Sequence, residues 1–164
     1  MPVPPDFLAF LRLLREKHVR YLLVGGYAVN FYGHSRRTDD LNVWIALHPE
    51  NAARLADALV EFGFARESVA PRLFLTAGRI VRMGRAPLRL EILNEISGVR
   101  FDDCYDRRVV AEIGNVSVAL IALPDLLANK QSAGRPKDLA DVAAFAEATT
   151  ARTARKPKRT RRKP

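Results

Sequence analysis

Paired cysteines and long apolar runs are both missing from this chain of 164 residues. No apolar run approaches the roughly 18 residues of a membrane span, so we expect no membrane partner. Cys104 is the single cysteine, which excludes an internal disulfide and fits a reducing compartment. The first residues lack the basic-then-apolar order of a secretory signal. These absences predict a cytoplasmic protein, and the length predicts one domain.

Acidic residues are absent from the last 14 positions, which hold eight of the 27 basic residues. The first 150 positions carry the other 19 basic residues and all 18 acidic ones, so the net charge of +9 comes almost entirely from the end of the chain. We therefore predict a globular domain over 1–148 and a disordered basic tail over 149–164. Two interpretations of the tail stay open: a solubilising terminus, or an electrostatic contact with RNA or DNA phosphates.

Helix and strand patterns alternate through the domain. Apolar residues at helical spacing, with Pro and Gly at the ends, predict helices over 7–14, 27–32, 49–62, 124–132 and 136–148. In the last of these helices, we expect Leu139, Val142, Ala143 and Ala146 to face the core. Apolar alternation predicts strands over 19–24, 41–47, 72–76, 79–83, 88–93 and 116–121. The expected fold is α/β (α+β), a mixed sheet flanked by helices, with further helices at the C-terminal end.

A glycine pair follows the first predicted strand and opens a short helix. Gly25 and Gly26 would let the backbone pass close to a ligand, and the free N–H groups of a helix start favour phosphate. A simple turn is the alternative interpretation of the pair. Asp40 begins the next strand, and this order is typical of an enzyme that handles a nucleoside triphosphate with magnesium.

Three side chains on predicted strands form a candidate metal site. Asp40 and Asn42 point to the same face because strand side chains alternate. Glu91 lies inside a strongly apolar strand, where an uncompensated charge is costly. Their oxygens are the hard ligands that Mg²⁺ prefers, so we predict that they hold the metal. An ion pair with a neighbouring arginine is the alternative for Glu91, and Asn42 stands where a second carboxylate is expected.

These motifs together resemble the nucleotidyltransferase superfamily, which has a polymerase-beta-like fold, in the small bacterial branch related to AbiEii-type nucleotidyltransferase toxins. The resemblance covers about residues 19–145. The matching features are Gly25 and Gly26, then Arg36, Thr38, Asp40 and Asn42, then Glu91, then the stretch 126–141.

The resemblance implies a role for each matched residue. It implies that an acceptor hydroxyl attacks the α-phosphate in line, with Mg²⁺ as cofactor and Glu91 as proton acceptor. RNA, including a tRNA end, or a protein would be the acceptor, and a toxin role with an antitoxin partner is implied. The implied catalytic and metal-binding residues are Asp40, Asn42 and Glu91. The implied nucleotide-binding residues are Gly25, Gly26, Arg36, Thr38, Lys130, Arg135 and Lys137.

Two positions depart from the family pattern and support a second hypothesis. Asn42 removes one negative charge, and Glu91 is one methylene longer than the usual Asp. Catalysis of this kind depends on preorganised charge. The alternative is therefore a catalytically impaired member that acts as a nucleotide- or nucleic-acid-binding regulator.

Overall fold

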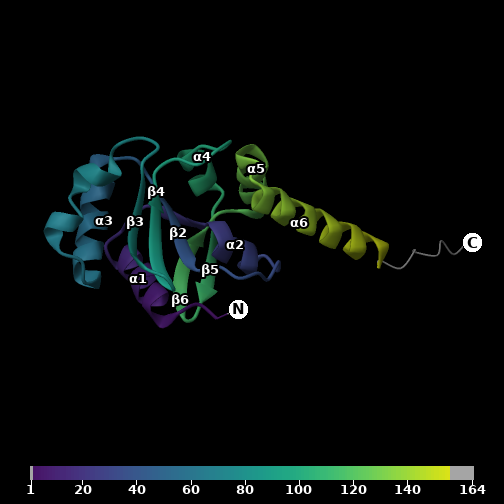
Figure 1. Ribbon diagram of the computed structural model, residues 1–164, viewed down its shortest axis with the longest axis horizontal. Coiled ribbons are helices and arrows are strands. Elements are labelled where there is room, and N and C mark those ends of the chain that lie inside the picture. The colour runs from purple at the N-terminus through teal and green to yellow at the C-terminus, as the bar shows by residue number, and fades with distance from the viewer. Residues whose placement is uncertain (1, 156–164) are drawn as a thin grey trace, which may run out of the picture.

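A six-stranded sheet in the order β3-β4-β2-β1-β6-β5 organises the computed structural model, which describes residues 2–155 (Figure 1). β1 pairs antiparallel with β2 and parallel with β6, and β2 pairs parallel with β4. The sheet is therefore mixed, as the sequence predicted. The strands are β1 (Tyr21–Val24), β2 (Asp40–Ile45), β3 (Ile80–Arg85), β4 (Leu88–Leu93), β5 (Val109–Ile113) and β6 (Val116–Leu120).

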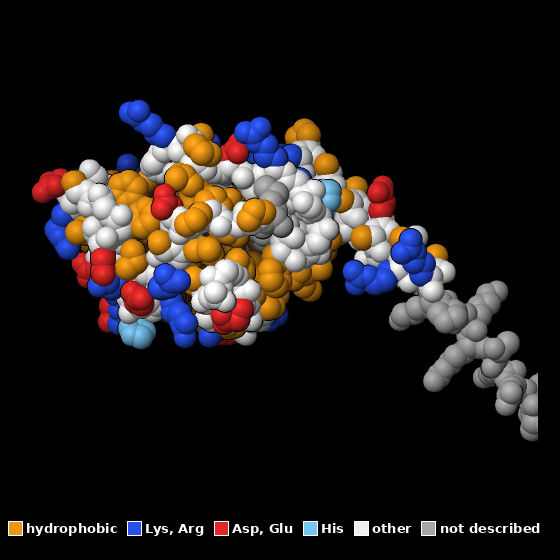
Figure 2. Space-filling model, turned by 90° about the horizontal axis from the view of Figure 1, so that it is seen from below, with side chains coloured by type: hydrophobic (Ala, Val, Ile, Leu, Met, Phe, Trp, Pro, Cys, Tyr) orange, Lys and Arg blue, Asp and Glu red, His pale blue; other side chains and the backbone are white. Residues whose placement is uncertain are grey.

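Helices flank the sheet and extend beyond it. In Figure 1, α6 projects away from the body of the molecule, and Figure 2 shows basic side chains near its outer end. Within residues 2–155, no helix is long and apolar enough to cross a membrane. The helices are α1 (Pro5–Glu16), α2 (Gly25–Phe31), α3 (Pro49–Phe62), α4 (Phe101–Asp106), α5 (Leu123–Ala133) and α6 (Pro136–Ala154), with 3₁₀ turns η1 (Arg66–Ser68) and η2 (Pro71–Phe74).

The hydrophobic core forms where helix and strand periodicities meet. α1 buries the apolar stripe that its sequence spacing predicted, namely Phe7, Phe10, Leu11 and Leu14, and it packs beside α3. Along β2, Leu41 is fully buried, while Asp40 and Asn42 are only partly buried. Strand alternation thus sends one side of β2 into the core and leaves polar side chains on the other.

Three segments differ from the sequence prediction. The strand predicted over 72–76 is wrong: the chain there forms η2, which begins at Pro71 and buries Phe74. α4 and β5 were not predicted. α4 has only six residues and offers little periodicity, and the exposed start of β5 obscures its alternation.

The last helix is longer than predicted. α6 continues to Ala154, so residues 149–154 of the predicted tail are helical. In this segment, the Thr149, Thr150 and Thr153 hydroxyls each donate to a carbonyl oxygen four residues earlier. Ala148, Ala151 and Ala154 lie among these threonines, and alanine is the best helix former. Residues 156–164 of the predicted tail lie outside the described part of the chain.

Candidate functional site

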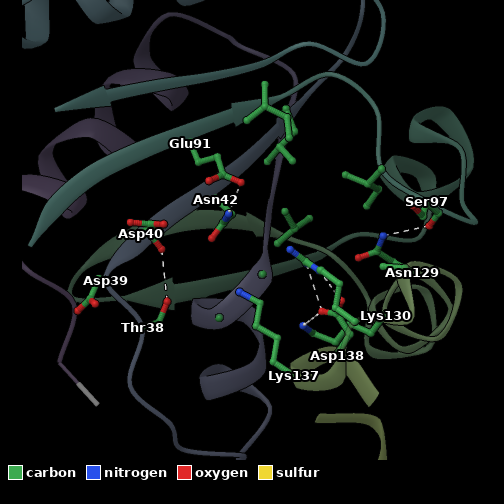
Figure 3. Close-up of a pocket in the computed structure, with 18 of the residues that line it drawn as sticks. Thr38, Asp39, Asp40, Asn42, Glu91, Ser97, Asn129, Lys130, Lys137 and Asp138 are labelled. Carbon is green, nitrogen blue, oxygen red and sulfur yellow. Dashed lines mark hydrogen bonds and ion pairs between the residues drawn. The ribbon is translucent and has the colours of Figure 1, made fainter. Parts of the chain in front are cut away.

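One open cavity of about 930 Å³ contains the predicted site residues. The ten residues predicted from the sequence come from four separate stretches of the chain, and all ten line this cavity. Figure 3 shows β2 and β4 on one side and the N-terminal part of α6 on the other. The fold therefore brings the predicted residues together, while their chemical roles remain predictions.

The glycine pair lies against other predicted site residues. A Cβ atom on Gly25, whose φ is +68°, would lie 2.7 Å from Asn42 Oδ1. A Cβ atom on Gly26 would collide with the Thr38 hydroxyl. The pair thus allows Thr38 and Asn42 to approach the first turn of α2, where no side chain caps the helix. This packing role does not depend on a ligand, and phosphate binding by the pair stays a prediction.

Carboxylates and arginines alternate on the sheet face of the cavity. Arg89 lies beside Asp40 in the register of β2 and β4 and binds it through two hydrogen bonds, from Nε (3.0 Å) and Nη2 (2.9 Å). This pairing raises the pKa of Arg89 above its ordinary value. Glu91 accepts hydrogen bonds from Asn42 Nδ2 (3.2 Å) and Arg82 Nε (3.2 Å). The ion pair that was the alternative interpretation of Glu91 is therefore present, and it forms at the predicted metal site.

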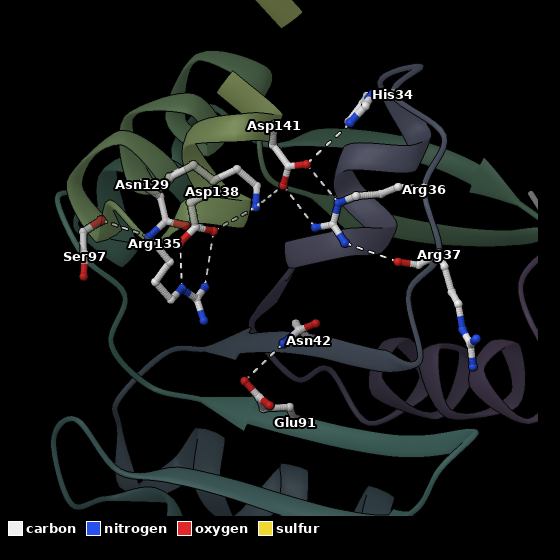
Figure 4. Close-up of polar contacts among 11 residues, drawn as sticks. His34, Arg36, Arg37, Asn42, Glu91, Ser97, Asn129, Arg135, Asp138 and Asp141 are labelled. Carbon is white, nitrogen blue, oxygen red and sulfur yellow. Dashed lines mark hydrogen bonds and ion pairs between the residues drawn. The ribbon is translucent and has the colours of Figure 1, made fainter. Parts of the chain in front are cut away.

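A buried ionic cluster forms the opposite wall of the cavity (Figure 4). Lys130 Nζ lies 2.9 Å from Asp141 Oδ2 and 3.3 Å from Asp138 Oδ1. Arg36 binds both oxygens of Asp141, at 2.9 and 3.0 Å, and Arg135 binds both oxygens of Asp138. Lys130, Asp138 and Asp141 expose 4%, 1% and 2% of their side chains. Through Arg36, the cluster thus connects α5 and α6 to the loop between α2 and β2.

Ionisation of the two buried aspartates reflects their partners. Burial alone would raise their pKa values, but hydrogen bonds and charge from the basic neighbours outweigh it. The pKa of Asp138 is lowered chiefly by Arg135 and Lys130, and that of Asp141 by Lys130 and Arg36. Both carboxylates are therefore charged at neutral pH.

The polar face of α6 corrects one sequence prediction. Leu139 was expected to face the core, but 43% of it is exposed, and Ala143 and Ala146 are exposed as well. The buried residues of α6 are instead Asp138, Asp141 and Phe145. The amphipathic rule fails here because the cations of other elements supply partners for buried carboxylates.

Sequence reasoning missed the two arginines on the sheet face. Arg89 lies two residues before Glu91 on β4, so strand alternation alone could have placed it on the same face. Arg82 lies opposite Glu91 through the β3–β4 hairpin. The pairing of Arg89 with Asp40 could not be found in this way, because it depends on β2 lying beside β4.

One basic side chain reaches the cavity without a partner. Within residues 2–155, Lys137 has no hydrogen bond or ion pair, and Figure 3 shows its side chain extending from α6 into the cavity. The described lining holds seven basic and five acidic residues. A concave surface with this excess of positive charge favours an anionic ligand.

Three other residues play no part in the cavity lining. His48 accepts a hydrogen bond from the backbone N–H of Glu50 and caps α3. Cys104 is fully buried, and burial, with a smaller effect of Asp125, raises the pKa of its thiol to about 11. A thiol with this pKa stays protonated at neutral pH and is a poor nucleophile. Trp44 is a core residue.

Comparisons with known proteins identify the fold. No protein-family model and no curated protein matches the sequence. Among solved structures, the chain is similar to a "putative nucleotidyltransferase" from Thermotoga maritima, with a TM-score of 0.51 and 14% sequence identity. The match covers 92% of this chain and 93% of the other. The fold is nucleotidyltransferase-like. At this identity the similarity concerns the fold alone, and the relation to the AbiEii branch remains a prediction.

Nucleotidyltransferase-like folds typically use a divalent metal. Among residues 2–155, no group of three or more His, Cys, Asp or Glu side chains is arranged to hold one. The metal ligands predicted from the sequence are the Asp40 and Glu91 carboxylates and the Asn42 amide oxygen, which all line the cavity. An all-oxygen set of this kind fits Mg²⁺ in its chemistry, with two anionic ligands and one neutral ligand.

Proposed function

We propose that the chain is a magnesium-dependent nucleotidyltransferase, which moves a nucleoside monophosphate from a nucleoside triphosphate to a hydroxyl group of RNA or protein. The observation that carries the proposal is the meeting of ten sequence-predicted residues in one basic cavity of a nucleotidyltransferase-like fold. Toxin activity restrained by an antitoxin is the biological setting that we propose for this reaction.

Different residues of the cavity would bind the triphosphate, hold the metal ion and accept the proton. The backbone of the glycine pair and the free ammonium group of Lys137 would bind the triphosphate, while Lys130 would add positive charge from the wall. Asp40, Asn42 and Glu91 would hold Mg²⁺, which activates the attacking oxygen and stabilises the leaving group when bound. Glu91 would accept the hydroxyl proton. The acceptor oxygen then bonds to the α-phosphorus, and the bond to the bridging oxygen breaks with release of pyrophosphate.

Label transfer tests the activity directly. The purified full chain is incubated with Mg²⁺, total cellular RNA and each α-³²P-labelled nucleoside triphosphate in turn. We expect label to enter RNA or the protein itself with at least one nucleotide, and Asp40→Ala to abolish the transfer. Asp57→Ala is the matched control, because Asp57 lies on α3, does not line the cavity and forms an exposed ion pair with Arg66. Equal transfer by Asp40→Ala and the wild type would contradict the proposal.

A second candidate function is a catalytically impaired regulator that binds nucleotide or nucleic acid. The specific observation in its favour is the neutral Asn42, together with the arginines on both carboxylates. Under this hypothesis, nucleoside triphosphate binds in calorimetry while no nucleotide transfers label to any acceptor. Label transfer that depends on Asp40 would exclude it.

Deleting the basic end of the chain tests whether nucleic acid is a partner. Residues 156–164 carry six basic residues and no acidic one, and counterion release makes such contacts steeply dependent on salt. Deleting this segment should weaken RNA binding and flatten its salt dependence, while Asp40→Ala should leave both intact. Unchanged RNA affinity and salt slope in the deletion variant would assign the segment to solubility alone.

A further inference from the structure

Both carboxylates of the proposed metal site already bind a cation from a neighbouring strand position. Arg89 places two N–H groups on the two oxygens of Asp40. Arg82 places its Nε on one oxygen of Glu91, and Asn42 donates to the other. Before a metal can use these oxygens fully, the arginines must therefore give up their contacts.

These arginines can move more freely than the cations of the buried cluster. The side chains of Arg82 and Arg89 are 57% and 41% exposed, whereas that of Lys130 is 4% exposed. The Asp40 and Glu91 side chains are 23% and 14% exposed, so releasing these pairs returns the guanidinium groups to water and leaves each carboxylate at the wall of the open cavity. Separating Lys130 from its aspartates would instead leave buried charges without partners. The sheet-face arginines are thus the exchangeable cations of the cavity.

A triphosphate is the ligand that suits the released arginines. The guanidinium group has a planar fork of donors that matches phosphate oxygens as well as it matches carboxylates. Arg82 and Arg89 both line the cavity beside the proposed metal ligands. A metal ion arriving without phosphate would lie beside cations that have no other partner, and it would be repelled by them.

We propose that Arg89 and Arg82 bind the phosphates of the nucleotide, and that they pair with Asp40 and Glu91 until the nucleotide arrives. Triphosphate and divalent metal then enter the cavity together. This inference rests on the proposed function and assigns the arginines a role beyond it. Each carboxylate exchanges its arginine for the metal, and each arginine exchanges its carboxylate for phosphate. Because linkage is reciprocal, each ligand then raises the affinity of the other.

Replacement of Arg89 separates this exchange from ordinary electrostatics. Mn²⁺ binding to the full chain is measured by electron paramagnetic resonance, with and without a saturating α,β-methylene nucleoside triphosphate. Binding of the analogue alone is measured by calorimetry. The variants are Arg89→Ala, Arg89→Lys and the control Arg85→Ala. Arg85 is an exposed β3 residue that does not line the cavity and has no ion pair within residues 2–155.

The exchange predicts opposite effects of Arg89→Ala on the two ligands measured alone. Mn²⁺ alone should bind about threefold or more tightly, because Asp40 is freed from its pair. The analogue alone should bind at least about threefold more weakly, because a phosphate ligand is lost. The enhancement of Mn²⁺ affinity by the analogue should shrink. Arg89→Lys keeps the charge but lacks the planar guanidinium donors. Its Mn²⁺ and analogue affinities should lie between those of the wild type and Arg89→Ala.

Two results would overturn the inference in distinguishable ways. If the wild type binds Mn²⁺ with the analogue but Arg89→Ala matches Arg85→Ala in every measurement, Arg89 does not exchange Asp40 for phosphate. The proposed function then stands. If the wild type binds no Mn²⁺ even with the analogue, both the inference and the metal-dependent function fail.

Discussion

The two walls of the cavity use the same pairing of carboxylates with cations in different surroundings. On the α5–α6 wall, Asp138 and Asp141 are buried together with Lys130. On the sheet wall, Asp40 and Glu91 pair with arginines whose side chains are about half exposed. Burial makes the loss of one partner costly, whereas exposure makes partners replaceable. The comparison indicates that the helical wall fixes the shape of the cavity and the sheet wall exchanges ligands.

The largest expected effect comes from breaking the buried wall. Asp141→Ala leaves Lys130 with Asp138 alone and removes the two carboxylate oxygens that accept hydrogen bonds from Arg36 Nε and Nη2. Removal of one partner from a buried ion pair costs about 3–5 kcal/mol, so the free energy of unfolding in urea should fall by this order. The exposed-pair control, Asp57→Ala, should change it by no more than about 1 kcal/mol. Equal effects of the two variants would contradict the distinction between buried and exposed pairs.

The pH dependence of stability should come from the same wall. Because the folded pKa values of Asp138 and Asp141 are lowered, their stabilising contribution is complete above the unfolded pKa of about 3.9. It is lost as the pH falls through the lower folded pKa values. The melting temperature should therefore drop steeply below about pH 4. In Asp141→Asn, this acid-induced drop should be smaller, and an identical profile would show that Asp141 does not contribute.

A smaller effect is expected from adding charge to the sheet wall. Asn42→Asp removes the donor to Glu91 and sets two carboxylates side by side. Mg²⁺ affinity should rise, by about tenfold, because the site gains an anionic ligand. Calorimetry with Mg²⁺ measures this change. Unchanged or weaker affinity would mean that position 42 does not face the metal, and increased nucleotide transfer would identify the natural chain as an attenuated enzyme.

The smallest expected effect is on stability when a sheet-wall arginine is removed. Arg89→Ala breaks a pair whose arginine is 41% exposed and whose aspartate faces the open cavity, so the unfolding midpoint in urea should fall far less than in Asp141→Ala. The same variant should change ligand binding, as described above. A drop in midpoint comparable to that of Asp141→Ala would show that the sheet wall is structural as well.

Much of this site could be predicted from sequence because its markers are local. A glycine pair after a buried strand, an acidic residue at the start of the next strand and a lone Glu91 in an apolar strand are each visible within a few residues. Lys130 and Arg135 came from the resemblance to a family. Asp138 pairs with Arg135, which is three residues away on the same segment, but Asp141 binds Arg36, which is 105 residues away.

The sequence by itself determined the mixed α/β class and most of the helices and strands, because periodicity and spacing are properties of neighbouring residues. Tertiary structure alone decided which charges neutralise one another. β4 lies beside β2 and α6 lies against α5, and these contacts give Asp40 its arginine and make aspartates the buried face of α6. Partners far apart in sequence cannot be predicted from local pattern, since only the packed fold sets the distance between them.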